Sequence, residues 1–167
     1  LGGIAVTGDS YDNKFVACQA WGGAWFKGGV PTINACTGFS LDARPAELLQ
    51  FGANSWTDCS ALDFDHGAIL MRSEFGFWTS CNLDANRYWG LVIDAGANKN
   101  QFVNLWASSN GLDGGGGIKI RGVDTIENLF NGLHGRFNGP SLVGPDIDIA
   151  AGCSIFADEN MFQENRV

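Results

Sequence analysis

The chain has 167 residues, a formal net charge of −8 and only ten lysines and arginines. So few cations argue against a nucleic acid or an anionic membrane surface as a partner, and a charged fraction of 17% is too low for a disordered tail or a coiled coil. The 24 glycines and the 12% of aromatic residues favour short strands separated by tight turns. No apolar run approaches the roughly 18 residues of a membrane-spanning helix, so no membrane insertion is predicted.

From its first residues onward, the chain repeats a glycine followed by alternating apolar positions. Alternate side chains of a strand face opposite sides, so the second and fourth residues of each copy are predicted to point inward. The third residues, among them Trp25, Ile69 and Val92, are predicted to face outward and to be covered by the segment 42–50 or by a neighbouring subunit. The copies occupy residues 3–6, 23–26, 38–41, 67–70, 90–93 and 117–120.

A second phrase of six residues interleaves with the first. It begins with a large apolar residue, has Cys or Leu at its fourth position, and occupies residues 15–20, 33–38, 56–61, 78–83, 102–107 and 130–135, with a weaker final copy at Phe162. Its fourth positions are 18, 23, 22, 24 and 28 residues apart, which is typical of one β-solenoid turn per copy. An asparagine stands two residues before the aromatic residue at Asn13, Asn54, Asn100 and Asn128.

Coils stacked about 4.8 Å apart are predicted to align these phrases into inward ladders. The first positions give the ladder Phe15, Ile33, Trp56, Trp78, Phe102 and Phe130, and the fourth positions give Cys18, Cys36, Cys59, Cys81, Leu105 and Leu133. The four cysteines are interpreted as reduced, small apolar core residues. The chain is predicted to bend at the third position of the phrase, at Ala17, Ala35, Asp58, Ser80, Asn104 and Gly132.

One domain is predicted to cover residues 1–167, with residues 42–50 as a side insertion and residues 139–167 as less regular C-terminal coils. Leu1 begins close to a strand and Val167 ends inside a weak phrase. Solenoids normally hide such open ends, so we expect the sequence to be a fragment of a longer chain.

The Asn-x-Phe-x-x-Cys-x-Ala phrase alternating with Gly-Ile-x-Val resembles the pectate-lyase-like superfamily, and among its members most closely the bacteriophage tailspikes. The resemblance covers residues 3–135 well. It implies an all-β fold, a right-handed single-stranded parallel β-helix of about six to eight coils. It also implies work on carbohydrate, a homotrimer, and an extracellular location on a virion tail.

Because the resemblance implies carbohydrate work, carboxylates in stacked loops are the catalytic candidates. The loops 62–66, 84–89 and 108–113 belong to consecutive coils and contain Asp63, Asp65, Asp84 and Asp113. Adjacent coils would place carboxylates about 5 Å apart and alternate coils about 10 Å apart, which brackets the separations of retaining and inverting glycosidases. Asp63 or Asp65 with Asp84 would be the close pair, and either with Asp113 the distant pair. The plainer reading is that these aspartates accept backbone N–H bonds in turns.

The outward positions of the last strand of each coil form a polar row suited to binding sugar, with Trp106 and Asn82 as the candidates for substrate contact. A solvated sheet face would have the same composition. Arg87 and Tyr88 are further substrate-binding candidates in the middle loop. The row reads Gln19, Thr37, Ser60, Asn82, Trp106 and His134.

Calcium, which pectate lyases hold with clustered aspartates, is an option because Asp63, Asp65, Asp84 and Arg87 lie in neighbouring loops. No dense ligand string such as D-x-D-x-D-G is present, so neither a metal nor a cofactor is predicted.

Three functions remain open. The first is a tailspike-type receptor-binding protein that binds a bacterial surface polysaccharide and hydrolyses it as a glycoside hydrolase. The second is a non-catalytic stalk or a carbohydrate-binding adhesion module, because these residues are not diagnostic of catalysis. The third is a polysaccharide lyase.

Overall fold

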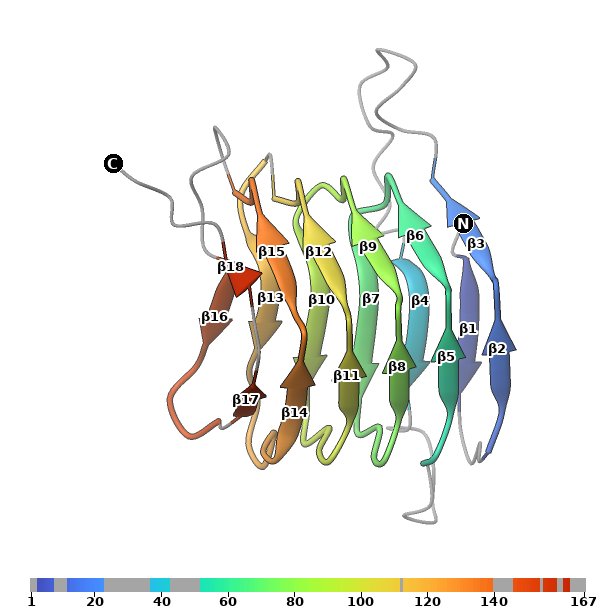
Figure 1. Cartoon of the computed structure of the whole chain (residues 1–167). Coiled ribbons are helices and arrows are strands. Elements are labelled where there is room, and N and C mark those ends of the chain that lie inside the picture. Colours follow the sequence, from blue (N-terminus) through green and yellow to red (C-terminus); the bar gives the residue numbers. More distant parts are fainter. Residues whose placement is uncertain are drawn as a thin grey trace.

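The computed structural model describes residues 3–7, 12–22, 37–42, 52–111, 113–139, 146–153, 155–158 and 161–162. The strands of this part of the chain form three sheets of six parallel strands, and each coil contributes one strand to each sheet (Figure 1). The chain is a right-handed parallel β-helix of about five to six coils, so the predicted fold class is confirmed, with the coil count at the low end of the predicted range.

The three sheets are named here in the order in which the chain visits them. Sheet one contains β1 (Ile4–Thr7), β4 (Thr37–Asp42), β7 (His66–Met71), β10 (Trp89–Asp94), β13 (Gly116–Ile120) and β16 (Ile147–Ile149). Sheet two contains β2 (Lys14–Val16), β5 (Ser55–Thr57), β8 (Phe77–Thr79), β11 (Gln101–Val103), β14 (Asn128–Asn131) and β17 (Ile155–Asp158). Sheet three contains β3 (Gln19–Trp21), β6 (Ser60–Leu62), β9 (Asn82–Asp84), β12 (Trp106–Ser108), β15 (His134–Arg136) and β18 (Met161–Phe162).

The apolar positions of both phrases form the core, as predicted from their alternation. In sheet one, the second and fourth residues of the glycine phrase, such as Leu91 and Ile93, are fully buried. In sheet two, the rings of Trp56 and Trp78 stack with centroids 5.0 Å apart. Cys59 and Cys81 are buried in the same core cluster, so the prediction that they pack as small apolar residues is confirmed. No single coil can bury these faces alone, and the stack does so.

The first two coils pair differently from the prediction. Phe15 pairs directly with Trp56 and Ile4 directly with Phe39, so the predicted rungs at Ile33, Cys36 and Trp25 between them are wrong. Thr37 begins β4 of sheet one and pairs with His66, so it does not belong to the polar row of sheet three. Residues 23–36 lie outside the described residues, and so does the predicted insertion 42–50 except for Asp42, which ends β4. The copies of the two phrases at residues 23–26 and 33–38 have the same apolar pattern as the others. Such a pattern alone does not determine which strands pair with each other.

The last coil also differs from the prediction. Phe162 pairs with Gly135 in sheet three, whereas Ala157 of β17 pairs with Phe130 in sheet two. The weak final copy of the six-residue phrase is therefore out of step by one sheet.

The bends between sheets two and three fall where the sequence predicted them. The third residue of each described six-residue phrase adopts the left-handed conformation, with φ from 51° to 68°, at Ala17, Asp58, Ser80, Asn104 and Gly132. A left-handed residue reverses the local twist and turns the chain sharply, and small or turn-prone side chains tolerate it best. Each later coil repeats this corner, which keeps the sheets in register.

Two buried columns of asparagine hold the other corners. In the first column, Asn13 Nδ2 donates to Asn54 Oδ1 (2.9 Å) and Asn100 Nδ2 to Asn128 Oδ1 (3.0 Å). In the second column, Asn86 Nδ2 donates to Asn110 Oδ1 (2.9 Å). The second column was not predicted, although the sequence pattern pointed to the first.

Candidate functional site

The three loops predicted to stack lie side by side at the third corner, between sheet three and sheet one, along the upper edge of Figure 1. The backbone N–H of Arg87 donates to Phe64 O (2.7 Å), and that of Tyr88 donates to Asp65 O (2.9 Å). On the other side, the N–H of Asp113 donates to Arg87 O (3.3 Å). The prediction that these loops stack is therefore confirmed.

The corner turns around the side chain of Asn86, which points inward and is completely buried. Its Oδ1 accepts the backbone N–H of Phe64 (3.1 Å), and its Nδ2 donates to Asn110 Oδ1. Candidate side chains that precede Asn86 in the chain face outward from sheet three. Those that follow it lie on the side of sheet one. The column therefore divides the candidate residues into two groups.

On the sheet-one side, Arg87 holds two carboxylates from the neighbouring loops. Its Nε lies 2.7 Å from Asp113 Oδ2 and its Nη1 lies 3.8 Å from Asp65 Oδ1. Its guanidinium carbon is 4.9 Å from the centre of the Tyr88 ring, and that ring is 5.7 Å from the imidazole of His66. We call Asp65, His66, Arg87, Tyr88 and Asp113 the arginine cluster.

Burial lowers the pKa of His66, against the opposing charge of Asp65. His66 begins β7 and is partly buried.

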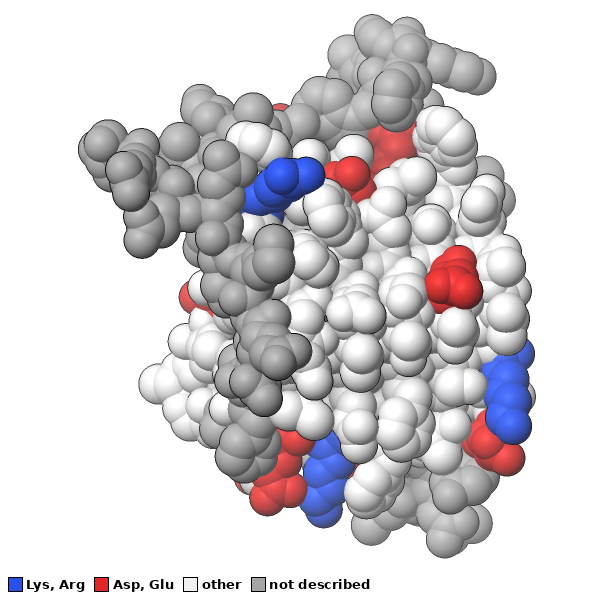
Figure 2. Space-filling view, in the orientation of Figure 1, with Lys and Arg blue, Asp and Glu red and all other residues white. Residues whose placement is uncertain are grey.

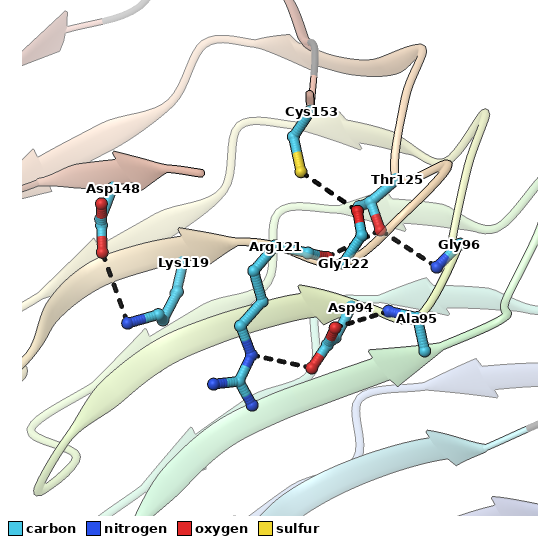
Figure 3. A network of polar contacts seen from close by, with 9 residues as sticks. All are labelled: Asp94, Ala95, Gly96, Lys119, Arg121, Gly122, Thr125, Asp148 and Cys153. Carbon is cyan, nitrogen blue, oxygen red and sulfur yellow. Dashed lines mark hydrogen bonds and ion pairs between the residues drawn. The ribbon is translucent and has the colours of Figure 1, made fainter. Parts of the chain in front are cut away.

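Charged pairs continue from the arginine cluster across the outer face of sheet one. Lys119 Nζ lies 3.4 Å from Asp148 Oδ2 and 4.9 Å from the centre of the Trp89 ring. Arg121 Nε lies 2.8 Å from Asp94 Oδ2, and Figure 3 shows these two pairs on neighbouring strands. The described cations of this face thus lie beside carboxylates or aromatic rings.

On the sheet-three side lies a second group, Asn82, Asp84, Trp106, His134 and Arg136, which we call the sheet-three cluster. The ring of Trp106 stacks on His134 with centroids 5.3 Å apart and planes 22° apart. The guanidinium carbon of Arg136 lies 4.8 Å from the centre of the Trp106 ring.

Asp84 is the candidate carboxylate whose protonation is shifted most clearly by its surroundings. Its Oδ1 accepts the N–H of Ala85 (2.8 Å). Burial raises its pKa, and this effect outweighs the hydrogen bonds from Ala85 and Ser109 and the nearby charge of Arg136. Asp84 therefore retains a proton to higher pH than a solvated aspartate does.

The eight candidate residues thus fall into two groups and one outlier. Asp65, Arg87, Tyr88 and Asp113 come together in the arginine cluster, and Asn82, Asp84 and Trp106 come together in the sheet-three cluster. Asp63 stands apart at the bend itself, with φ 64° and 1% of its surface exposed, so it does not face solvent.

Neither His66 nor Arg136 was among the residues predicted to bind substrate, and His134 was predicted only as a member of the polar row. For Arg136 a signal was present, since it stands two residues after His134 in one strand and so faces the same side.

No family model and no curated protein matches this sequence. Among solved structures, the fold is similar to that of a periplasmic alginate epimerase, AlgG, solved as a double mutant. The TM-score is 0.67 at 14% sequence identity, and the match covers 96% of this chain. The chain spans 36% of the length of that protein. Similarity at this level of identity establishes the parallel β-helix and leaves the chemistry to the residues.

Proposed function

We propose that this chain recognises a bacterial surface polysaccharide at the third corner of the helix and hydrolyses its glycosidic bonds, as the resemblance to tailspikes implies. One observation carries the proposal. A single corner bears Asp84, whose pKa is raised by burial, on one side and two carboxylates held by Arg87 on the other. The fold similarity to a protein named for its action on alginate supports a polysaccharide as the ligand class.

In this proposal Asp84 is the general acid. A carboxyl group that stays protonated to higher pH is suited to donate its proton to the leaving glycosidic oxygen. The second carboxylate is Asp113, whose side chain is 46% exposed and so open to substrate and water. It accepts a proton from the water that attacks the anomeric carbon, which completes hydrolysis. Arg87 and Tyr88 bind the sugar beside it.

The proposal extends to assembly and location. It includes a homotrimer on the outside of a virion tail, which is what the resemblance to tailspikes implies. The mass in solution, measured by light scattering, is expected to correspond to three copies, and a monomer would remove this part of the proposal.

A second candidate is a carbohydrate-binding module without catalysis. Two observations favour it. Asp65 and Asp113 both pair with the guanidinium of Arg87, and Asp84 lies on the other side of the corner at Asn86. A chain of sugars crossing the corner would then be held from both sides without being cut.

The experiment measures release of reducing ends from a panel of purified bacterial surface polysaccharides. Asp84→Asn is expected to lower the rate about a hundredfold or more while binding is retained, because a general acid contributes on this scale. Asp113→Asn is expected to have a similar effect, whereas Asp148→Asn, a matched change on the outer face of sheet one, is expected to leave the rate unchanged.

Binding without release of reducing ends would favour the non-catalytic module. Absorbance from an unsaturated uronic acid would instead identify a lyase. Cleavage that survives Asp84→Asn would overturn the assignment of the acid.

A further inference from the structure

On the outer face of sheet three, a row of short polar side chains ends at an indole ring. The strands β3, β6, β9 and β12 pair in register at Gln19, Ser60, Asn82 and Trp106. Side chains in one register column of a parallel sheet face the same side, about 4.8 Å apart. Because amide and hydroxyl side chains are shorter than tryptophan, the indole stands above the residues that precede it in the row.

The two faces of this indole have different neighbours. His134 stacks on the ring, and the Arg136 guanidinium lies 4.8 Å from its centre; both residues come from β15, the next strand. The neighbour on the opposite side is Asn82 of β9. Within the described part of the chain, no aromatic ring or cation stacks on the indole from that side. One face of the Trp106 indole, the supported face, thus packs against residues of β15. The other face, the free face, points toward Asn82 and the rest of the polar row.

Two polar atoms next to the indole lack hydrogen-bond partners. They are Oγ of Ser108, which is 2% exposed, and Oδ1 of Asn82. Ser108 lies two residues after Trp106 in β12, so both side chains face outward from sheet three. Buried polar atoms without partners are costly and are uncommon in native proteins. Both atoms are shielded from solvent, so a sugar hydroxyl reaches them only after a neighbouring side chain moves aside.

The charge of this face limits the kind of ligand. Figure 2 shows that the surface formed by sheets two and three carries few lysine, arginine, aspartate or glutamate side chains. Arg136 is engaged with the supported side of the indole, so its charge is not offered to an acidic group on the other side. The arginine cluster and the charged pairs of sheet one lie on the other side of the Asn86 corner.

We infer that Trp106 is the stacking platform of a separate subsite that takes a neutral hexopyranose unit of a polysaccharide. The apolar face of the sugar ring packs on the free face of the indole, because pyranose C–H groups suit an aromatic surface. Its hydroxyl groups bond to the amide of Asn82 in the polar row. The inference rests on the proposed recognition of a polysaccharide and is independent of cleavage.

Native affinity electrophoresis tests this subsite in gels that contain neutral polymers, namely dextran, mannan and galactan, or acidic polymers, namely alginate and polygalacturonate. Wild type is expected to be retarded by at least one neutral polymer. Trp106→Ala is expected to weaken that retention about tenfold, the scale of one aromatic stacking contact with its buried area. Trp106→Phe, which keeps a smaller ring, is expected to fall between the two.

Two variants serve as controls. Trp21→Ala removes another tryptophan from the same sheet, one that is 65% exposed, and is expected to change retention less than twofold. Asp148→Asn alters an exposed ion pair on the outer face of sheet one and is expected to leave retention by the neutral polymer unchanged. Arg87→Ala, which alters the arginine cluster, is measured beside the controls. Thermal unfolding of each variant verifies that it is folded.

The outcomes separate the two proposals. Retention that is lost in Arg87→Ala but kept in Trp106→Ala and Trp106→Phe overturns the subsite and leaves the proposed function standing. Retention only by acidic polymers also overturns it. No retention by any polymer contradicts both proposals, and retention through Trp106 without cleavage of any polymer removes only the hydrolase.

Discussion

The side-chain Nδ2 of Asn100 donates to Oδ1 of Asn128 in the next coil across 3.0 Å, and both residues are fully buried. Oδ1 of Asn100 in turn accepts the backbone N–H of Gly76 (3.0 Å), and its Nδ2 also donates to Ser73 O (2.9 Å). The Asn100 amide therefore links the backbone of one coil to a side chain of the next. Because these groups are buried, water cannot replace the hydrogen bonds that the amide makes.

Asn100→Ala is expected to lower the free energy of unfolding by about 2–3 kcal/mol, because it leaves the Gly76 N–H and the Ser73 carbonyl buried without these partners. Urea denaturation at equilibrium measures the change. Asn131→Ala, on the outer row of sheet two, is the control and is expected to cost less than about 0.5 kcal/mol. Similar losses for both variants would contradict a structural role for the column.

Gly76 interrupts this column, since it stands two residues before Trp78, where the other coils have asparagine. A Cβ at this position would lie 2.7 Å from Asn100 Oδ1, so the Asn100 side chain has to shift in any variant that adds one. Gly76→Asn is expected to add a donor to Asn100 Oδ1, as Asn13 Nδ2 supplies to Asn54. It should therefore be more stable than Gly76→Ala by about 1 kcal/mol. Calorimetry of the two variants compares their stability directly. If the alanine variant is at least as stable as the asparagine variant, an asparagine at position 76 does not extend the column.

Asp84→Asn is expected to raise stability near neutral pH. Burial raises the pKa of Asp84 above its ordinary value of 3.8, so the folded chain favours the neutral form. That contribution is fully present below pH 3.8 and is lost as the pH rises through the folded-state pKa. Denaturation curves of wild type and variant should converge in acid and separate toward neutral pH. Asp148→Asn, which alters an exposed ion pair, should show only a small difference at either pH. A wild type that is the more stable protein at neutral pH would contradict the prediction.

Cys81 is expected to resist alkylation in the native protein. Burial raises its pKa to about 12, and its thiol donates to the Trp56 carbonyl (3.4 Å). Because the thiolate is the reactive species, iodoacetamide should label Cys81 only as the chain unfolds. Peptide mass spectrometry should find earlier labelling at Cys18, which is only half-buried. Equal labelling rates for both thiols in native buffer would show that the core opens readily at Cys81.

Most of the fold could be predicted from the sequence, because the same short pattern of residues recurs in each coil. The bends at Asp58 and Ser80 were predicted from small or turn-prone residues at a fixed place in the phrase, and the structure shows that both residues are left-handed. The pairing of Phe15 with Trp56 was missed, because the copy at residues 33–38 satisfied the same apolar pattern. The alternation of apolar residues shows which face of a strand is buried. Which strand it pairs with depends on all the coils of the stack.

The candidate site was predicted less completely than the fold. Stacking of the three loops followed from the repeat, but the direction of each side chain depended on Asn86 turning inward. The sequence shows Asp84 and Arg87 three residues apart and gives no sign that a buried amide separates them onto two faces. Likewise, the burial of Asp63 follows from its left-handed bend, which was not among the bends predicted.

The unequal spacing of the coils has a consequence for the order of folding. Neighbouring asparagines are 41 residues apart between the first two coils, at Asn13 and Asn54, but 24 apart at Asn86 and Asn110. Closing a longer loop costs more conformational entropy, and folding slows as contacts become less local. Nucleation is therefore expected in the closely spaced central coils, with the N-terminal coil docking last and opening first. Hydrogen exchange would then be fastest in β1–β3, even though their strands pair as regularly as those of the middle coils.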